Sequence, residues 1–158
     1  DCSAVADALK TFSGVEHRIE RVAELEGVVF YNDSKSTNID SLKVALESFD
    51  EPIVLIAGGE GKGSDYTLLS DVMQQGVKTL VALGTDAPKM IEAWGDKIPS
   101  ILVKTMAEAV RVAYSQAHAG DVVLLSPACA SFDMYTNFEA RGRDYKACVR
   151  AVLEEVTS

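Results

Sequence analysis

The chain changes abruptly from apolar to polar in one stretch, Val28-Val29-Phe30-Tyr31-Asn32-Asp33-Ser34-Lys35-Ser36-Thr37-Asn38. The first four residues have the β-branched and aromatic side chains that favour a buried strand. The remaining residues are all polar. A buried strand that ends in hydroxyls, amides, a carboxylate and a lysine is typical of a ligand site in an open α/β sheet. Capping of a following helix by Thr37 or Asn38 explains one of these residues, but not the whole run.

A second stretch has the same pattern of an apolar run followed by a segment with polar residues. The apolar run 122–125 is followed by Ser126-Pro127-Ala128-Cys129-Ala130-Ser131-Phe132-Asp133. Two strand ends of this kind in one small domain predict a single shared cleft.

Apolar strands alternate with amphipathic helices along the chain. The expected strands are 18–25, 28–31, 53–57, 79–83, 101–103 and 122–125, and the expected helices are 5–12, 39–49, 66–75, 88–94, 106–118 and 145–156. The alternation predicts an α/β fold with a mostly parallel sheet and helices on both faces. The first two strands, which turn at Gly27, predict an antiparallel hairpin. No repeat or linker interrupts the pattern, so we expect a single domain over residues 1–158.

Composition restricts the partners and the compartment. The net charge of −9 argues against a nucleic-acid-binding surface, and no apolar run approaches membrane-spanning length. The three cysteines, Cys2, Cys129 and Cys148, form no disulfide framework, and no signal peptide is visible, so we expect a cytoplasmic protein. Because the chain begins with Asp1 rather than Met, we expect it to be an excised domain of a longer protein.

A glycine-rich loop, Gly58-Gly59-Glu60-Gly61-Lys62-Gly63-Ser64-Asp65, follows the third expected strand. Its glycines would let backbone amides approach an anion, and Lys62 would supply a countercharge. The loop is neither a Walker A sequence nor Gly-x-Gly-x-x-Gly. A flexible turn with an exposed lysine explains the composition equally well.

Other reactive residues have plainer interpretations. Cys129 has no sequence relation to His17 or His118, which favours a small buried thiol over a nucleophile. Ser131 lacks the Gly-x-Ser-x-Gly pattern, so we interpret it as a hydroxyl donor. An arginine such as Arg18 before a strand can clamp phosphate, although spacing alone favours a solvated residue. No zinc-ligand spacing and no calcium loop are present.

Five segments in order carry a family resemblance. They are His17-Arg18-Ile19-Glu20, Asn32-Asp33-Ser34-Lys35-Ser36-Thr37-Asn38, Gly58-Gly59-x-x-Lys62-Gly63, Ser126-Pro127-Ala128-Cys129-Ala130-Ser131-Phe132-Asp133 and Asn137-Phe138-Glu139-x-Arg141-Gly142. Together they resemble the C-terminal domain of the bacterial Mur ligases, and within that family the member that adds D-glutamate. The resemblance extends from about Leu9 to the final helix.

The resemblance implies a Rossmann-like third domain that closes over two others. The N-terminal domain of such an enzyme holds the UDP-sugar, and the central domain carries the ATP P-loop, the magnesium ligands and a modified lysine. ATP activates the carboxylate of UDP-N-acetylmuramoyl-L-alanine as an acyl phosphate, and the D-glutamate amine attacks it, giving an amide, ADP and phosphate. The isolated domain is therefore expected to be inactive and to bind neither ATP nor Mg²⁺ tightly.

The resemblance also assigns site residues. The set expected around D-glutamate is Thr37, Lys62, Ser131, the backbone of Phe132 and the ring of Phe138. The set expected around the nucleotide is Arg18, Asp33 (on the ribose) and Lys35. No catalytic residue and no metal ligand is expected on this chain. Ser36 departs from the family, which usually has a small apolar residue at that position.

Two other functions are alternatives to a ligase domain. The first is a stand-alone nucleotide or small-anion binding module without catalysis. The full reading frame of the gene would distinguish such a module from a ligase domain. A Gly-x-x-x-x-Gly-Lys-Ser/Thr segment upstream of Asp1 would support the ligase, and a Met directly before Asp1 would support the module. A Rossmann dehydrogenase is disfavoured, because Gly-x-Gly-x-x-Gly is missing.

Overall fold

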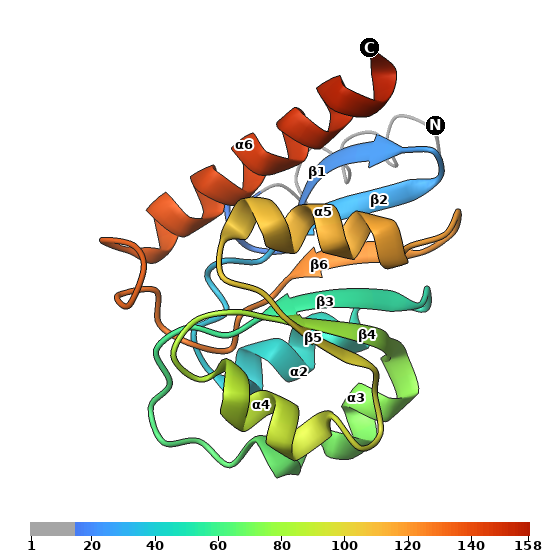
Figure 1. Ribbon diagram of the computed structural model, residues 1–158. Coiled ribbons are helices and arrows are strands. Elements are labelled where there is room, and N and C mark those ends of the chain that lie inside the picture. Colours follow the sequence, from blue (N-terminus) through green and yellow to red (C-terminus); the bar gives the residue numbers. More distant parts are fainter. Residues whose placement is uncertain (1–14) are drawn as a thin grey trace, which may run out of the picture.

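The computed structural model describes residues 15–158, so the helix expected at 5–12 and Cys2 lie outside the described residues. The strands are β1 (Glu20–Leu25), β2 (Val28–Asn32), β3 (Ile53–Ala57), β4 (Val77–Ala82), β5 (Ser100–Leu102) and β6 (Val122–Leu125). The helices are α2 (Ile39–Glu47), the 3-10 helix η1 (Tyr66–Leu69), α3 (Ser70–Gly76), α4 (Ala87–Trp94), α5 (Met106–Gln116) and α6 (Phe138–Thr157). Figure 1 shows these elements in chain order.

One six-stranded sheet has the order β1-β2-β6-β3-β4-β5. Every neighbouring pair is parallel except β1 and β2, which run antiparallel. The mostly parallel sheet and the hairpin expected from the sequence are therefore confirmed. The last strand, β6, lies between β2 and β3, so the connection from β2 to β3 passes over it. Strands β1 and β2 therefore lie on one side of β6, and β3, β4 and β5 lie on the other.

The hairpin has a two-residue turn at Glu26 and Gly27. Both residues have positive φ, 50° and 81°. This is the conformation that right-twisted strands favour in a tight hairpin, with glutamate where asparagine is commoner. The strand expected to begin at residue 18 begins at Glu20, because His17 and Ile19 also have positive φ, 70° and 44°.

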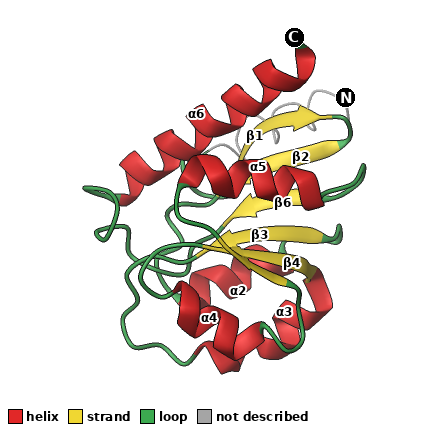
Figure 2. Ribbon diagram, viewed as in Figure 1, coloured by secondary structure: helices red, strands yellow, loops and turns green. Residues whose placement is uncertain are grey.

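Each face of the sheet has its own apolar core. In β3, Leu55 and Ala57 pack against the core formed with α2, α3 and α4, while Val54 and Ile56 pack against the core formed with α5 and α6. Figure 2 shows α5 on the near side of the sheet and α2 on the far side. Strands covered on both faces are apolar at successive positions, as the sequence of β3 is.

Two helices differ from expectation. The helix expected at 66–75 is divided into η1 and α3, each too short to form stably without packing. Helix α6 begins at Phe138, seven residues before the expected start at Tyr145. The side chain of Asn137 caps it by accepting a 2.8 Å hydrogen bond from the amide of Ala140. Gly142 lies in the second turn of α6, although glycine weakens a helix.

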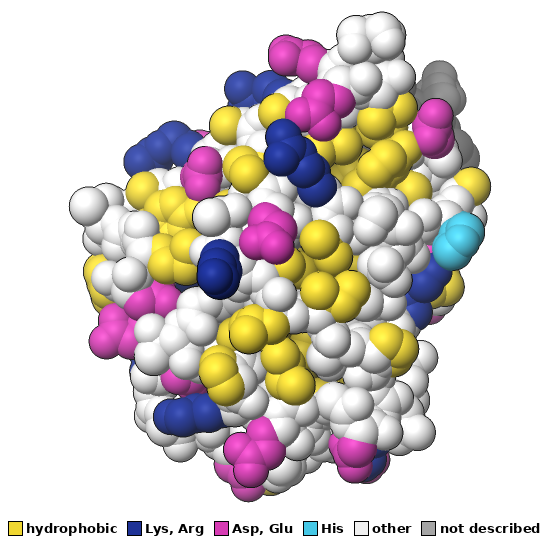
Figure 3. All heavy atoms as spheres, viewed as in Figure 1, with side chains coloured by type: hydrophobic (Ala, Val, Ile, Leu, Met, Phe, Trp, Pro, Cys, Tyr) yellow, Lys and Arg dark blue, Asp and Glu magenta, His cyan; other side chains and the backbone are white. Residues whose placement is uncertain are grey.

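Two observations on residues 15–158 concern membranes and nucleic acids. Within residues 15–158, no helix has both the length and the apolar composition needed to cross a bilayer. On the face covered by α5 and α6, basic and acidic side chains are interspersed (Figure 3).

We expect Gly142→Ala to lower the free energy of unfolding by about 1–3 kcal/mol. A Cβ at residue 142 would lie 2.1 Å from Nδ1 of His17, and the buried imidazole has no space into which to move. Chemical denaturation followed by circular dichroism measures the change. Gly76→Ala is the matched control, because a Cβ there meets no atom within 4 Å. Equal stability of the two variants would contradict the packing described for α6.

Candidate functional site

The polar segment after β2 folds into a compact turn. The Ser34 amide donates to Oδ1 of Asn32 at 3.1 Å, and the Ser36 amide donates to the carbonyl of Asp33 at 2.9 Å. Asn38 caps α2 by accepting from the Ser41 amide at 2.9 Å. Capping therefore falls to Asn38, and the side chain of Thr37, which is half-buried, is left for another role.

The ends of β2 and β6 meet, but no residue of the second polar stretch lines the cavity beside the first, so the single shared cleft expected from the sequence stays a prediction. The strands are adjacent and parallel, with Asn32 opposite Leu125. Beyond them, the Asp33 amide donates to the Leu125 carbonyl at 2.7 Å, and Ser126 Oγ donates to Asp33 Oδ2 at 2.8 Å. The Ile19 amide donates to the other oxygen, Oδ1, at 3.1 Å. The Asp33 carboxyl group is therefore held in one orientation from two sides.

Burial changes the acidity of Asp33. Removal from water raises the pKa of this carboxyl group to about 6, and the hydrogen bonds from Ser126 and Ile19 and the charge of Arg18 only partly oppose the shift. Each carboxylate oxygen has a further lone pair available, so the group can still accept a hydrogen bond from a ligand.

Arg141 in α6 joins the loops after β2 and β6. Its Nε donates to Ser34 Oγ at 2.9 Å, one terminal nitrogen donates to the Ser34 carbonyl at 2.7 Å, and the other donates to the Cys129 carbonyl at 2.9 Å. Ser34 Oγ in turn donates to the Phe138 carbonyl at 2.7 Å. The guanidinium group is buried, which lowers its pKa to about 10, so it stays charged at neutral pH. Its three partners are neutral, and it therefore adds a fixed positive charge behind the loops.

The glycine-rich loop after β3 pairs with the loop after β6. Glu60 and Ala130 exchange backbone hydrogen bonds of 2.9 and 3.0 Å, and the Gly58 amide donates to the Pro127 carbonyl at 3.0 Å. A Cβ at Gly59 would lie 2.6 Å from the Ala130 carbonyl oxygen, so only glycine permits this approach. The start of the loop is thus fixed by hydrogen bonds and is not a free turn. Lys62, which is exposed, lies two residues after Glu60, the residue that pairs with Ala130.

The three residues expected around the nucleotide line one cavity. Arg18, Asp33 and Lys35 surround a volume of about 340 Å³ together with Ile19, Ser36, Ser41 and Val44. Ser36, the departure from the family, has a buried hydroxyl without a hydrogen-bond partner among the described residues. The cavity joins the segment before β1 to the loop after β2, which residue spacing alone did not bring together and which the family resemblance placed in one set.

The five residues expected around D-glutamate are more widely spread. Thr37 lies on the loop after β2, Lys62 on the loop after β3, and Ser131 and Phe132 on the loop after β6. Phe138 opens α6, and its ring meets that of His17 edge to face at 6.0 Å. Ser131 is buried, whereas the Phe132 side chain is 68 % exposed. All five come from the carboxyl edge of the sheet, and none of them lines the 340 Å³ cavity.

Sequence reasoning missed the residues that hold these loops in place. It gave no role to Arg141 or Ser34, although Arg141 stood in a segment quoted for the resemblance. It also missed the buried His17, whose Nδ1 accepts from Asn32 Nδ2 at 2.9 Å and whose Nε2 lies 3.2 Å from Glu16 Oε1. Burial lowers the pKa of His17 and keeps it neutral.

Neither covalent nor metal chemistry is supported by these residues. Cys129 is buried, and its burial raises the pKa of the thiol to about 11, which agrees with a structural role. Within residues 15–158, no group of three or more His, Cys, Asp or Glu side chains is arranged to hold a metal ion. Hydrogen-bond donors from several loops, with the buried guanidinium group of Arg141 behind them, suit the binding of an anionic small molecule.

Comparison with known proteins agrees with this picture. Residues 17–129 match the family described as Mur ligase, glutamate ligase domain. The chain is 49 % identical over 146 residues to the UDP-N-acetylmuramoylalanine--D-glutamate ligase of Chlorobium chlorochromatii, covering 92 % of this chain and 32 % of that protein. The chain therefore spans about a third of the length of this curated relative.

Solved structures share the fold at low sequence identity. The UDP-N-acetylmuramate-alanine ligase of Thermotoga maritima superposes with a TM-score of 0.62 at 15 % identity, over 96 % of this chain and 34 % of that one. The bifunctional folylpolyglutamate synthase/dihydrofolate synthase of Yersinia pestis, complexed with AMPPNP and manganese, has a TM-score of 0.54 at 15 % identity, over 89 % of this chain and 32 % of that one.

We expect Asp33 to make folding stability depend on pH. Its folded-state pKa of about 6 lies above the ordinary value of 3.8, so its stabilising contribution is complete below pH 3.8 and is lost as the pH rises through 6. Relative to Asp33→Asn, the wild type should lose on the order of 2 kcal/mol of unfolding free energy between pH 4 and 7. Urea denaturation at each pH measures the difference. Parallel curves for the two proteins would contradict the buried carboxyl group.

Proposed function

This chain belongs to the Mur ligase family, as its glutamate ligase domain, and from that premise we propose that it is the C-terminal domain of a longer, ATP-dependent amide ligase. The proposed reaction joins D-glutamate to UDP-N-acetylmuramoyl-L-alanine, a step in the synthesis of peptidoglycan precursors. The observation that carries the proposal is the convergence of the loops after β2, β3 and β6 at one edge of the sheet, with Arg18, Asp33 and Lys35 around one cavity.

The D-glutamate set has suitable chemistry for a ligand with two carboxylates. Lys62 would pair with one carboxylate, and the hydroxyls of Thr37 and Ser131 would donate to carboxylate oxygens. The Phe132 amide and the ring of Phe138 would complete the contacts. Because the loops are joined by the Glu60–Ala130 bridge, Lys62 and Ser131 project from neighbouring segments. The chain is acidic overall, with a net charge of −9, and Lys62 is the one basic side chain in this set.

The nucleotide set would hold ATP and later ADP. Arg18 and Lys35 would meet the anionic nucleotide, and the Asp33 carboxyl group, oriented by Ser126 and Ile19, would accept from a ribose hydroxyl. The Mg²⁺ that accompanies ATP would be bound by the central domain, as the family resemblance implies.

The part played by this domain is positioning. ATP would convert the alanine carboxylate into an acyl phosphate, and the residues described here would orient the D-glutamate amine for attack, giving an amide, ADP and phosphate. Orientation of two bound reactants lowers the barrier by several kcal/mol. Closure over the N-terminal and central domains would also exclude water from the acyl phosphate. ATP and UDP-linked sugars are intracellular substrates, so we place the enzyme in the cytoplasm.

The alternative, a stand-alone nucleotide or small-anion binding module, is not favoured. The D-glutamate ligase that resembles this chain is about three times as long, with the chain matching 32 % of its length. The reading frame that encodes residue 1 and the residues before it would decide between the two.

We expect Lys62→Ala in the complete ligase to raise the KM for D-glutamate by about 10- to 100-fold, because a charge-assisted hydrogen bond to a carboxylate is lost. The KM for UDP-N-acetylmuramoyl-L-alanine should stay within about twofold of the wild type. Steady-state kinetics with each substrate varied in turn measures both values. The control is Lys43→Ala, an exposed lysine on α2 outside the site. An unchanged KM for D-glutamate would reject the role given to Lys62.

We also expect the 158-residue chain alone to hydrolyse no ATP and to form no amide, because the P-loop and the metal ligands are assigned to another domain. A coupled ADP-release assay with all substrates present tests this expectation. Turnover above the level of a heat-denatured sample would show that the assignment of the P-loop and the metal ligands to another domain is wrong.

A further inference from the structure

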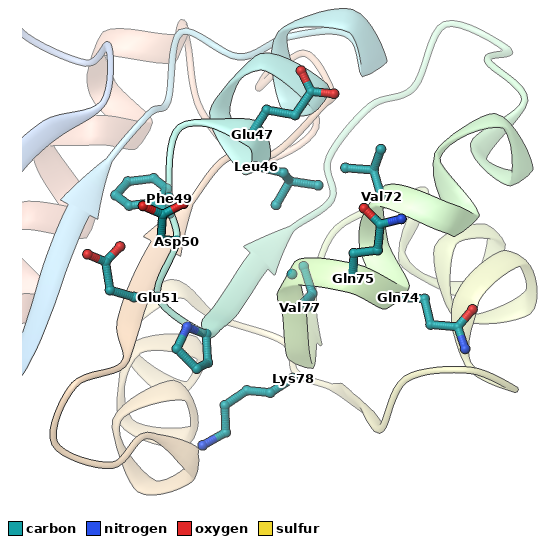
Figure 4. Close-up of a pocket in the computed structure, with 12 residues that line it drawn as sticks. Leu46, Glu47, Phe49, Asp50, Glu51, Val72, Gln74, Gln75, Val77 and Lys78 are labelled. Atoms are coloured by element: carbon teal, nitrogen blue, oxygen red, sulfur yellow. The ribbon is translucent and has the colours of Figure 1, made fainter.

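A second cavity lies at the opposite edge of the sheet from the ligand loops. It has a volume of about 510 Å³ and opens between the C-terminal ends of α2 and α3, where β3 and β4 begin. Figure 4 shows Leu46 and Val72 on its two sides, with Phe49, Asp50 and Glu51 on the loop that leads into β3. Its volume is in the range of ligand-binding clefts, about 300–1,000 Å³.

The floor of this cavity is apolar and fixed. Leu46 and Val77 are buried members of the core, and Phe49 and Val72 pack against that core while still lining the cavity. The ring of Phe49 is held edge to face against Tyr31, with 4.8 Å between the ring centroids. An aromatic ring that is fixed in place and reachable from the cavity offers a surface both to an apolar group and to a cation.

The rim is negatively charged and lacks a cationic partner. Glu47, Asp50 and Glu51 are exposed, and none of them takes part in an ion pair among the described residues. The one basic residue that lines the cavity, Lys78, is already paired with Asp121 at 2.6 Å. The uncompensated charge of the rim is therefore negative.

The helices add to this potential. Both α2 and α3 end at the cavity, and neither has a basic residue in its last turn. The C-terminal carbonyl groups of a helix carry partial negative charge and favour a cation nearby. The carboxylates, the helix ends and the aromatic ring thus all favour a positive charge joined to an apolar group.

We propose that this groove, lined by Leu46, Phe49 and Val72 and rimmed by Glu47, Asp50 and Glu51, binds a segment of a partner protein in which Lys or Arg flanks an apolar side chain. The apolar side chain enters between α2 and α3, and the flanking cations meet the acidic rim. The proposal does not depend on the ligase function, because the groove is at the amino edge of the sheet and shares no lining residue with the 340 Å³ cavity.

The test is an NMR titration of the ¹⁵N-labelled 158-residue chain with the peptide acetyl-Lys-Leu-Arg-Leu-Lys-amide. We expect saturable shifts that are largest at the amides of Phe49, Val72, Gln75 and Val77. The triple variant Glu47→Gln/Asp50→Asn/Glu51→Gln should weaken binding about tenfold, because three partly exposed ion pairs are lost.

Three controls make the outcome decisive. Glu92→Gln/Asp96→Asn/Glu154→Gln removes the same charge from exposed positions outside the groove and should leave the affinity within about twofold. The peptide acetyl-Glu-Leu-Glu-Leu-Glu-amide and spermidine each lack one of the two required features and should bind at least about tenfold more weakly. Equal binding of either probe, equal weakening in the two triple variants, or shifts outside the groove would overturn the proposal.

Discussion

The arrangement of the ligand loops depends on the buried guanidinium group of Arg141. Its hydrogen bonds reach Ser34 after β2 and Cys129 after β6, so one side chain from α6 fixes two loops that are about ninety residues apart in the chain. A buried charge without an acidic partner is unfavourable unless its donors are satisfied. The two loops accept hydrogen bonds from three of the five N–H groups of Arg141, and the guanidinium group places a fixed positive charge beside them. That charge lies behind the segments from which Lys62, Thr37 and Ser131 project, which suits an anionic ligand.

Much of the fold followed from local patterns, and the exceptions have physical causes. Apolar strands alternating with amphipathic helices gave the α/β class, the two-sided sheet and the hairpin. The two polar strand ends predicted a single shared cleft; the structure shows that β2 and β6 are adjacent, and the cavity beside the first end is lined by no residue of the second. The early start of α6 was not predicted. Glycine is unfavourable inside a helix, and Gly142 is explained only by its close approach to His17, a residue that is far away in the sequence. The role of Arg141 was missed for the same kind of reason, since its partners are carbonyl and hydroxyl oxygens on remote loops that no spacing rule identifies.

The two edges of the sheet differ in the chemistry that they present, although the chain as a whole is acidic. At the carboxyl edge, four basic residues (Arg18, Lys35, Lys62 and Arg141) lie among loops that also carry Asp33, Asp86 and Asp133 and that present backbone amides and hydroxyls. At the amino edge, helix C-termini and unpaired carboxylates surround an apolar floor. Parallel strands place all helix-to-strand connections at one edge and all strand-to-helix connections at the other. The topology therefore allows one small domain to present an anion site and a separate surface for a basic partner.

The central claim is that Arg141 holds the loops after β2 and β6 as one unit. Amide hydrogen exchange of Arg141→Met, compared with the wild type and with Arg141→Lys, tests it most directly. We predict that exchange at residues 33–38 and 126–131 accelerates together by at least about tenfold in Arg141→Met, because three hydrogen bonds are lost, while amides in β4 keep their protection. Arg141→Lys, which keeps the charge but not the planar donor geometry, should fall between the two. Unchanged exchange in both loops, or acceleration in one loop alone, would contradict the account.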